Sequence, residues 1–100
     1  MRPADVVLPA RVDVTTSADV RYALQIAIDA VVDGNVIVDA ALVETIDVAG
    51  LGVLVGAHRR ARQVGRQLVL CDARPRIVRL LAVTRLHRIL NLDRTSVRVS

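Results

Sequence analysis

Short apolar runs separated by longer helix-like stretches organise this chain. After Thr15-Thr16-Ser17, which offers a helix N-cap, apolar residues recur every three or four positions. The residues on this spacing are Val20, Leu24, Ala27, Ile28 and Val31. The stripe predicts an amphipathic helix with one face in the core. Asp19 in its first turn suits the helix dipole, and Gly34 is its expected stop.

Other apolar runs predict strands. Val36–Val38 is too short and too uniformly apolar for a half-exposed strand, so it is expected to be buried and parallel. Leu68–Cys71 is expected to be the next strand, with Cys71 as a buried, inert thiol. A first strand begins at Val6–Leu8 and ends at Arg11–Val14. Pro9 interrupts it, which predicts an irregular or edge segment.

Two further helices are expected. The second has its apolar side at Leu51, Leu54, Ala57, Ala61 and Val64 and ends at Gly65. The third opens at Pro75, and its buried residues are expected to be Ile77, Leu80, Leu81 and Val83. Leu86, Ile89, Leu90 and Leu92 predict a last short turn and strand, and 96–100 a terminal strand or frayed tail. This order of strands and helices predicts a single α/β domain over residues 1–100, with a small, mostly parallel sheet of about four strands.

Composition narrows the function. The chain is 53% hydrophobic but has one aromatic residue, Tyr22, so aromatic platforms for stacking bases are absent and direct nucleic-acid binding is not expected. No apolar run approaches the ~20 residues of a membrane span. The single cysteine excludes an internal disulfide and suits a reducing cytosol, which predicts a cytoplasmic protein.

Charge is unevenly distributed along the chain. Residues 51–100 carry 11 Arg and 2 acids, whereas residues 1–50 carry 3 Arg and 8 acids. Every basic residue is Arg, which we interpret mainly as genomic base composition. The alternative is a surface on the second half of the chain for nucleic acid or another anionic partner.

Three glycines invite comparison with a dinucleotide site. Gly50, Gly52 and Gly56 lie one residue off the dinucleotide fingerprint, and Asp72 stands where its acidic residue would be. These glycines nevertheless fall inside the predicted second helix. Gly52 and Gly56 are therefore expected to permit close packing of this helix on the sheet, with a phosphate cradle as the alternative.

The remaining polar residues give no catalytic set. His58 and His87 have no Cys, His or carboxylate at a ligand spacing, and no serine lies at a strand-to-helix elbow. We therefore expect no metal, no cofactor and no enzymatic activity. Asp13 and Asp47 differ, because both follow apolar strands. The two aspartates predict two helix caps or one shared recognition surface. These two interpretations are compatible with each other.

A family resemblance rests on the stretch around Asp47. The run Asp47-Val48-Ala49-Gly50-Leu51-Gly52 resembles the Asp-Ser-Ser/Thr-Gly-Leu-Gly motif of STAS domains, the anti-sigma-factor antagonists of bacteria. Further segments of the family are similar to Arg11-Val12-Asp13, to 65–71 and to 78–86. The resemblance therefore covers roughly residues 6–92. It implies a small sheet with helices packed mainly on one face.

The resemblance also implies a function. Such domains bind an anti-sigma factor of serine-kinase-type ATPase fold and so free the sigma factor. The implied partner surface consists of Asp47, Val48, Ala49, Gly50 and Leu51, with Asp13 and Thr15 beside it. The alternatives are a nucleotide-binding module that uses the helix start near Gly50, and an accessory subunit of a transport or lipid-trafficking complex.

The chain departs from the family pattern in two ways. The family's phosphoacceptor serine is replaced by Val48, followed by Ala49, so the usual phosphorylation cannot operate there. Thr45 has the wrong geometry to replace it. The family usually has an extra strand before the one at Val6, and often a further helix for which 93–100 is short. Without that strand, the edge at Val6–Val12 is unpaired, which predicts a homodimer.

Overall fold

Parallel strands flanked by three helices make up the computed structural model, which describes residues 4–32, 34–84 and 91–92. The elements in chain order are β1 (Val6–Val7), β2 (Arg11–Val12), α1 (Ser17–Ala30), β3 (Asn35–Asp39), β4 (Thr45–Ile46), α2 (Val48–Gln63), β5 (Gln67–Cys71), α3 (Pro75–Val83) and β6 (Asn91–Leu92). This order agrees with the predicted alternation of strands and helices, except that the first predicted strand is divided into β1 and β2, and β4 was not predicted. The predicted turn at Leu86, Ile89 and Leu90, with His87 and 96–100, lies outside the described residues.

The strands form two parallel ladders. The main sheet has four strands in the order β1-β3-β5-β6, and β2 pairs separately with β4. β3 and β5 make the longest pairing, from Asn35 opposite Gln67 to Asp39 opposite Cys71. Every strand pair described is parallel, as the buried apolar runs predicted. The carboxyl ends of β2 and β4 therefore open at the same end of the molecule.

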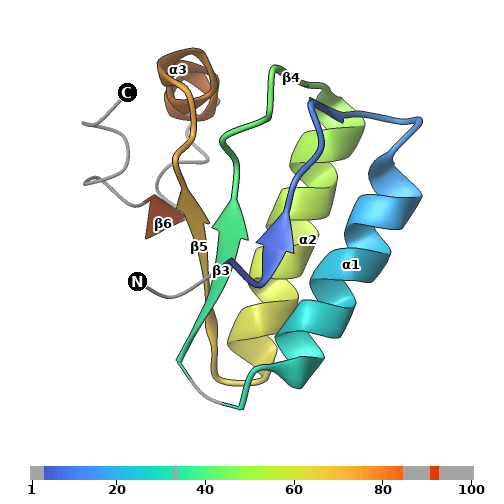
Figure 1. The fold of residues 1–100 in the computed structure, drawn as a ribbon, viewed down its shortest axis with the longest axis vertical. Helices are drawn as coiled ribbons and strands as arrows, with labels where there is room; N and C mark the ends of the chain where they lie inside the picture. The colour runs from blue at the N-terminus through green and yellow to red at the C-terminus, as the bar shows by residue number, and fades with distance from the viewer. Residues whose placement is uncertain (1–3, 33, 85–90, 93–100) are drawn as a thin grey trace.

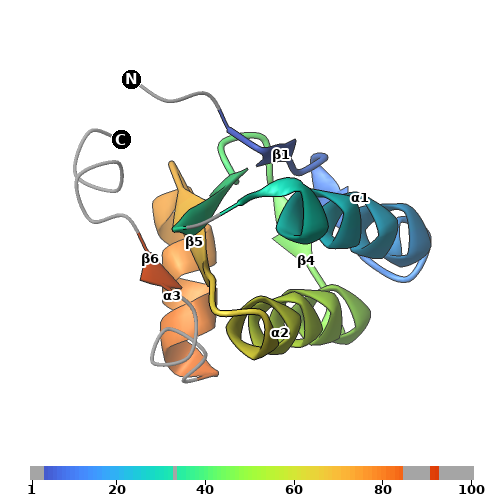
Figure 2. The ribbon, with the colours of Figure 1, turned by 90° about the horizontal axis from the view of Figure 1, so that it is seen from below.

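Helices cover the sheet unevenly. α1 and α2 lie side by side against one face of it (Figure 2), and α3 lies beyond the carboxyl end of β5 (Figure 1). The strands alternate accordingly: Val36, Val38, Leu68 and Leu70 belong to the buried core, whereas Ile37 and Val69 are half-buried. The expectation of helices mainly on one face is confirmed for α1 and α2.

The first helix has the predicted apolar face. Val20, Leu24, Ala27 and Ile28 are buried, and Val31 packs against the same core. The helix ends at Ala30 because Val31 turns to an extended conformation while its N–H still donates to Ala27 O, at 3.1 Å. Gly34, with φ of +79°, forms the following turn and is not the helix cap that was predicted.

Pro9 separates two short strands with different partners. β1 pairs with β3 at the edge of the main sheet, and β2 pairs with β4. The Leu8 N–H donates to Asp39 O at 2.9 Å just before the break. The predicted irregular edge segment is thus observed, and it carries the chain from the main sheet to the smaller ladder.

Three burial expectations are wrong. A Cβ at Gly52 or Gly56 would meet no atom within 4 Å, so neither glycine is required for packing on the sheet. Val83 is 81% exposed, because α3 packs through Ile77 and Leu81, one turn apart on another side of the helix. Cys71 is half-buried, since it lies on the opposite side of β5 from Leu68 and Leu70.

Candidate functional site

The ladder between β2 and β4 brings the two strand-terminal aspartates together. Val12 is paired with Ile46, and Asp13 and Asp47 are the next residues in the two chains. The Val14 N–H donates to Asp47 Oδ2 at 3.2 Å, and the Asp47 N–H donates to Val12 O at 3.2 Å. The prediction that both aspartates lie at one end of the fold is therefore confirmed.

Asp47 is the N-cap of α2. Its Oδ1 accepts the Gly50 N–H at 2.9 Å, while its Oδ2 accepts the Val14 N–H. Such a cap typically contributes about 1 kcal/mol, and a carboxylate there also suits the helix dipole. One side chain thus fixes both the start of α2 and the loop that leads into α1.

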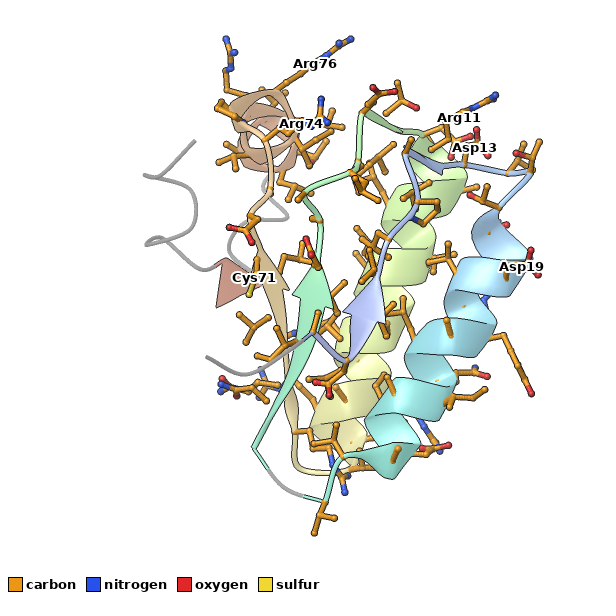
Figure 3. All side chains as sticks on the ribbon, viewed as in Figure 1. Arg11, Asp13, Asp19, Cys71, Arg74 and Arg76 are labelled. Carbon is orange, nitrogen blue, oxygen red and sulfur yellow. The ribbon has the colours of Figure 1, made fainter. Side chains whose placement is uncertain are left out.

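Asp13 does not cap α1 but closes the turn before it. Only 7% of Asp13 is exposed, and its Oδ1 accepts the Thr15 hydroxyl at 2.6 Å and the Thr15 N–H at 2.9 Å. Its Oδ2 accepts from Arg11 Nε at 2.9 Å. The Thr15 hydroxyl, followed by the Thr15 N–H and the Arg11 charge, lowers the pKa of Asp13 against the opposing effect of burial. Figure 3 shows Arg11 and Asp13 side by side at this end of the molecule. The Asp13 carboxylate is therefore engaged within the fold.

Gly50 is where α2 touches the backbone of β2. A Cβ at this position would lie 2.0 Å from Val12 O and 2.8 Å from Val12 C. No side chain fits there unless the backbone moves. Gly50 is buried, and the close approach of helix and strand explains why glycine stands at this place in the motif.

The accessible part of this region is a small patch that we call the α2-start patch: Val14, Thr15, Asp47 and Val48. Val48 is 85% exposed and Val14 is 71% exposed, while Ala49 and Leu51 are half-buried. Two aliphatic side chains thus stand in solvent beside the capping carboxylate. Isolated exposed apolar residues are common, but Val48 on a capped helix start, with Val14 in the adjoining loop, suits a protein contact.

Sequence reasoning missed Val14. Continued alternation from the buried Val12 would place Val14 in the core as well. It is exposed because the chain leaves the strand at Asp13, whose side chain accepts hydrogen bonds from Thr15. The signal available was the Asp13-Val14-Thr15 sequence, in which a short polar residue favours a local turn.

Comparison with known proteins decides the family, since the STAS domain model matches residues 4–98, nearly the whole chain. The chain belongs to the STAS domain family. Among solved structures, this STAS domain is similar to a Thermotoga maritima protein, tm1081, described provisionally as an anti-sigma factor antagonist. The TM-score is 0.74 at 20% identity, over 92% of this chain and 81% of the other. This likeness supports the shared fold.

The STAS domain shows no metal-binding cluster of His, Cys, Asp and Glu within its described residues. His58 is buried on α2, and its Nδ1 has no hydrogen-bond partner within that same part of the chain. Burial, and after it the charges of Arg62 and Arg59, lower the pKa of His58. His58 is therefore a neutral residue of the interior at physiological pH.

None of the helices in residues 4–32 and 34–84 is long and apolar enough to cross a membrane.

Proposed function

We propose that this STAS domain is a non-enzymatic, cytoplasmic antagonist of an anti-sigma factor, and that it binds a partner of serine-kinase fold through the α2-start patch. The observation that carries the proposal is the exposed Val48 on a helix start that Asp47 and Gly50 hold in place. A pre-organised surface loses little conformational entropy on binding, which favours protein recognition. Val14 and Thr15 extend this surface. The buried Asp13 carboxylate holds Thr15 in place through two hydrogen bonds.

The proposed binding is independent of phosphorylation. Val48 occupies the family's phosphoacceptor position, and neither it nor Ala49 has a hydroxyl. Thr45 is exposed, but it lies in β4 opposite Arg11 and not in the first turn of α2. A kinase that docks on the helix start therefore finds no hydroxyl in the first turn of α2. The hydroxyl of Thr15, elsewhere in the patch, donates to Asp13 Oδ1 at 2.6 Å.

The test is a titration of the purified domain against each serine-kinase-fold protein of its source organism, with and without ATP. We expect one such protein to bind with the same affinity in both conditions, and intact mass to show no added phosphate. Stoichiometric phosphate on Thr45 would contradict the proposal. The proposal would also be contradicted if the domain bound none of these proteins and instead captured a transporter ATPase subunit in a pull-down. That result would favour the accessory-subunit alternative.

The nucleotide-binding alternative has less support from the geometry. The Gly50 N–H, which an anion at the start of α2 would use, already donates to Asp47 Oδ1. The Asp47 carboxylate also places negative charge where a phosphate would sit, so the two groups would repel each other. Calorimetric titration with ATP and GTP is expected to show no heat of binding.

A homodimer through β1 is a further part of the proposal. β1 lies at the edge of the main sheet, and beside it an open groove of about 490 Å³ is lined mainly by apolar residues of α1. Val7 is 57% exposed and Ile26, in the groove, is 51% exposed. Covering such an edge and its neighbouring apolar surface with a second copy would be favourable.

Light scattering across a concentration series is expected to show a dimer at high concentration. Ile26→Glu should shift the equilibrium to the monomer, because it introduces two like charges into a symmetric interface. Val83→Glu, an equally drastic change at an exposed site on α3, should leave the equilibrium unchanged. A strict monomer for the wild type at high concentration would count against this interface.

A further inference from the structure

A second hollow lies beside the α2-start patch. A groove of about 400 Å³ runs between β4 and α3, and its apolar lining comes from Ile46, Ile77, Leu80 and Val83. Ile77 is buried, Ile46 and Leu80 are half-buried, and Val83 is 81% exposed. Ile46 directly precedes Asp47, so one lining residue of the groove is next in the chain to the patch.

The two rims of the groove carry opposite charge. Arg76 and Arg79 line it from α3, and Glu44 lines it from the start of β4. Figure 3 shows Arg76 reaching outward from α3. No acidic residue lies in α3, and the side chain of neither arginine forms an ion pair or hydrogen bond with any residue that the structure describes.

Several other arginines of the chain are engaged within the fold. Arg74 Nε donates to Ala41 O at 3.0 Å, Arg11 pairs with Asp13 at 2.9 Å, and Arg60 lies 3.4 Å from Asp29. The guanidinium groups of Arg76 and Arg79 have no such partner among the described residues and are available to bind carboxylates in bidentate fashion. Arginines on the exposed side of α2 are also unpaired within that part of the chain, but only Arg76 and Arg79 line this groove. Because these two arginines lie beside the apolar lining of the groove, a ligand could pair its carboxylates with them and bury its apolar side chains at the same time.

We infer that the groove between β4 and α3 receives a polypeptide segment of the protein partner, one in which aliphatic side chains are flanked by carboxylates. The aliphatic side chains cover Leu80 and Val83, and the carboxylates face Arg76 and Arg79. The Glu44 rim repels acidic groups and thereby fixes which way the segment lies. This inference rests on the proposed function, because it extends the α2-start patch into a longer docking surface for the same partner.

Nucleic acid fits this groove less well. A phosphate backbone would satisfy the arginines, but bases would meet aliphatic side chains where single-strand-binding surfaces place aromatic rings. An acidic, aliphatic peptide uses both the rim and the floor.

The experiment needs no knowledge of the partner. Two labelled 12-residue peptides of alternating sequence, Glu-Leu and Lys-Leu, and a 12-residue oligothymidylate are titrated against the protein at low and high salt by fluorescence anisotropy. We expect the Glu-Leu peptide to bind best and its affinity to fall with salt. The double change Arg76→Glu and Arg79→Glu should weaken it about tenfold, and Glu44→Lys should strengthen it.

Arg59→Glu with Arg62→Glu is the matched control, since it changes net charge equally on exposed residues in the second half of α2. It should leave peptide affinity near that of the wild type. The inference is overturned if the control weakens binding as much as the groove variant does, if the Glu-Leu peptide does not bind, or if oligothymidylate binds as tightly with the same dependence on Arg76 and Arg79. None of these peptide and oligonucleotide titrations uses an anti-sigma factor. They therefore test the groove independently of the proposed function, which is tested by the titration against kinase-fold proteins.

Discussion

Gly50→Ala should lower the free energy of unfolding by about 2–3 kcal/mol. The added methyl group would lie 2.0 Å from Val12 O, which is a backbone atom that cannot rotate away. The start of α2 would have to move off β2, and the Asp47 cap would move with it. A loss of this size should reduce Tm by more than about 10 °C for a domain of this length. Thermal unfolding followed by circular dichroism measures it.

Gly52→Ala and Gly56→Ala are the matched controls on the same helix. A Cβ at either position would meet no atom within 4 Å, so alanine should raise helix stability by about 0.5–1 kcal/mol at each site. The same substitution is thus expected to have opposite effects at positions two residues apart. If Gly50→Ala unfolds at the same temperature as Gly52→Ala, α2 does not rest on β2 as described.

Val48→Ser should make partner binding sensitive to ATP. The new hydroxyl would stand in the first turn of α2, at the position of the phosphoacceptor serine in the motif that this stretch resembles. Because Val48 is 85% exposed, the change should cost stability no more than about 0.5 kcal/mol. Phosphorylation would add about −1.5 to −2 charges beside Asp47. Binding should weaken by about tenfold to a hundredfold after incubation with ATP, while the wild type is unaffected. Calorimetric titration against the proposed kinase-fold partner measures the affinities of the wild type and of Val48→Ser after this incubation.

Val48→Asp tests the same surface without a kinase. It places one fixed negative charge at the helix start and should weaken binding in the absence of ATP. Tyr22→Asp is the matched control, because Tyr22 is 67% exposed on α1, outside the α2-start patch and outside both grooves. If Val48→Asp binds as tightly as Tyr22→Asp, the helix start is not the docking surface and the functional inference from the family motif fails.

Much of this fold could be predicted from the sequence, because its helices and central strands follow simple periods. The stripe from Val20 to Ile28 gave the buried face of α1, and the order of elements gave a parallel sheet with Asp13 and Asp47 at one end. Side-chain orientation was harder where a run is uniformly apolar. Leu68–Cys71 does not reveal which residues face the helices, so the half-buried position of Cys71 was missed.

The glycines illustrate a different limit. Spacing alone groups Gly50, Gly52 and Gly56, but only the rotation of α2 about its axis decides which of them approaches β2. That rotation depends on the packing of the whole helix against the core and the strands. Within the α2-start patch, Val14 was missed for a similar reason, because it leaves the strand alternation only once Asp13 has formed its turn.

Residue 48 is separate from what holds the helix start in place. Asp47 forms the cap, Gly50 allows the close approach to β2, and the Val48 side chain projects into solvent. Selection can therefore change the residue at this position without compensating substitutions elsewhere. A lineage could gain or lose covalent control of such a protein by a single replacement, while folding keeps Asp47 and Gly50 under constraint. Regulation and architecture would then evolve at different rates within four consecutive residues.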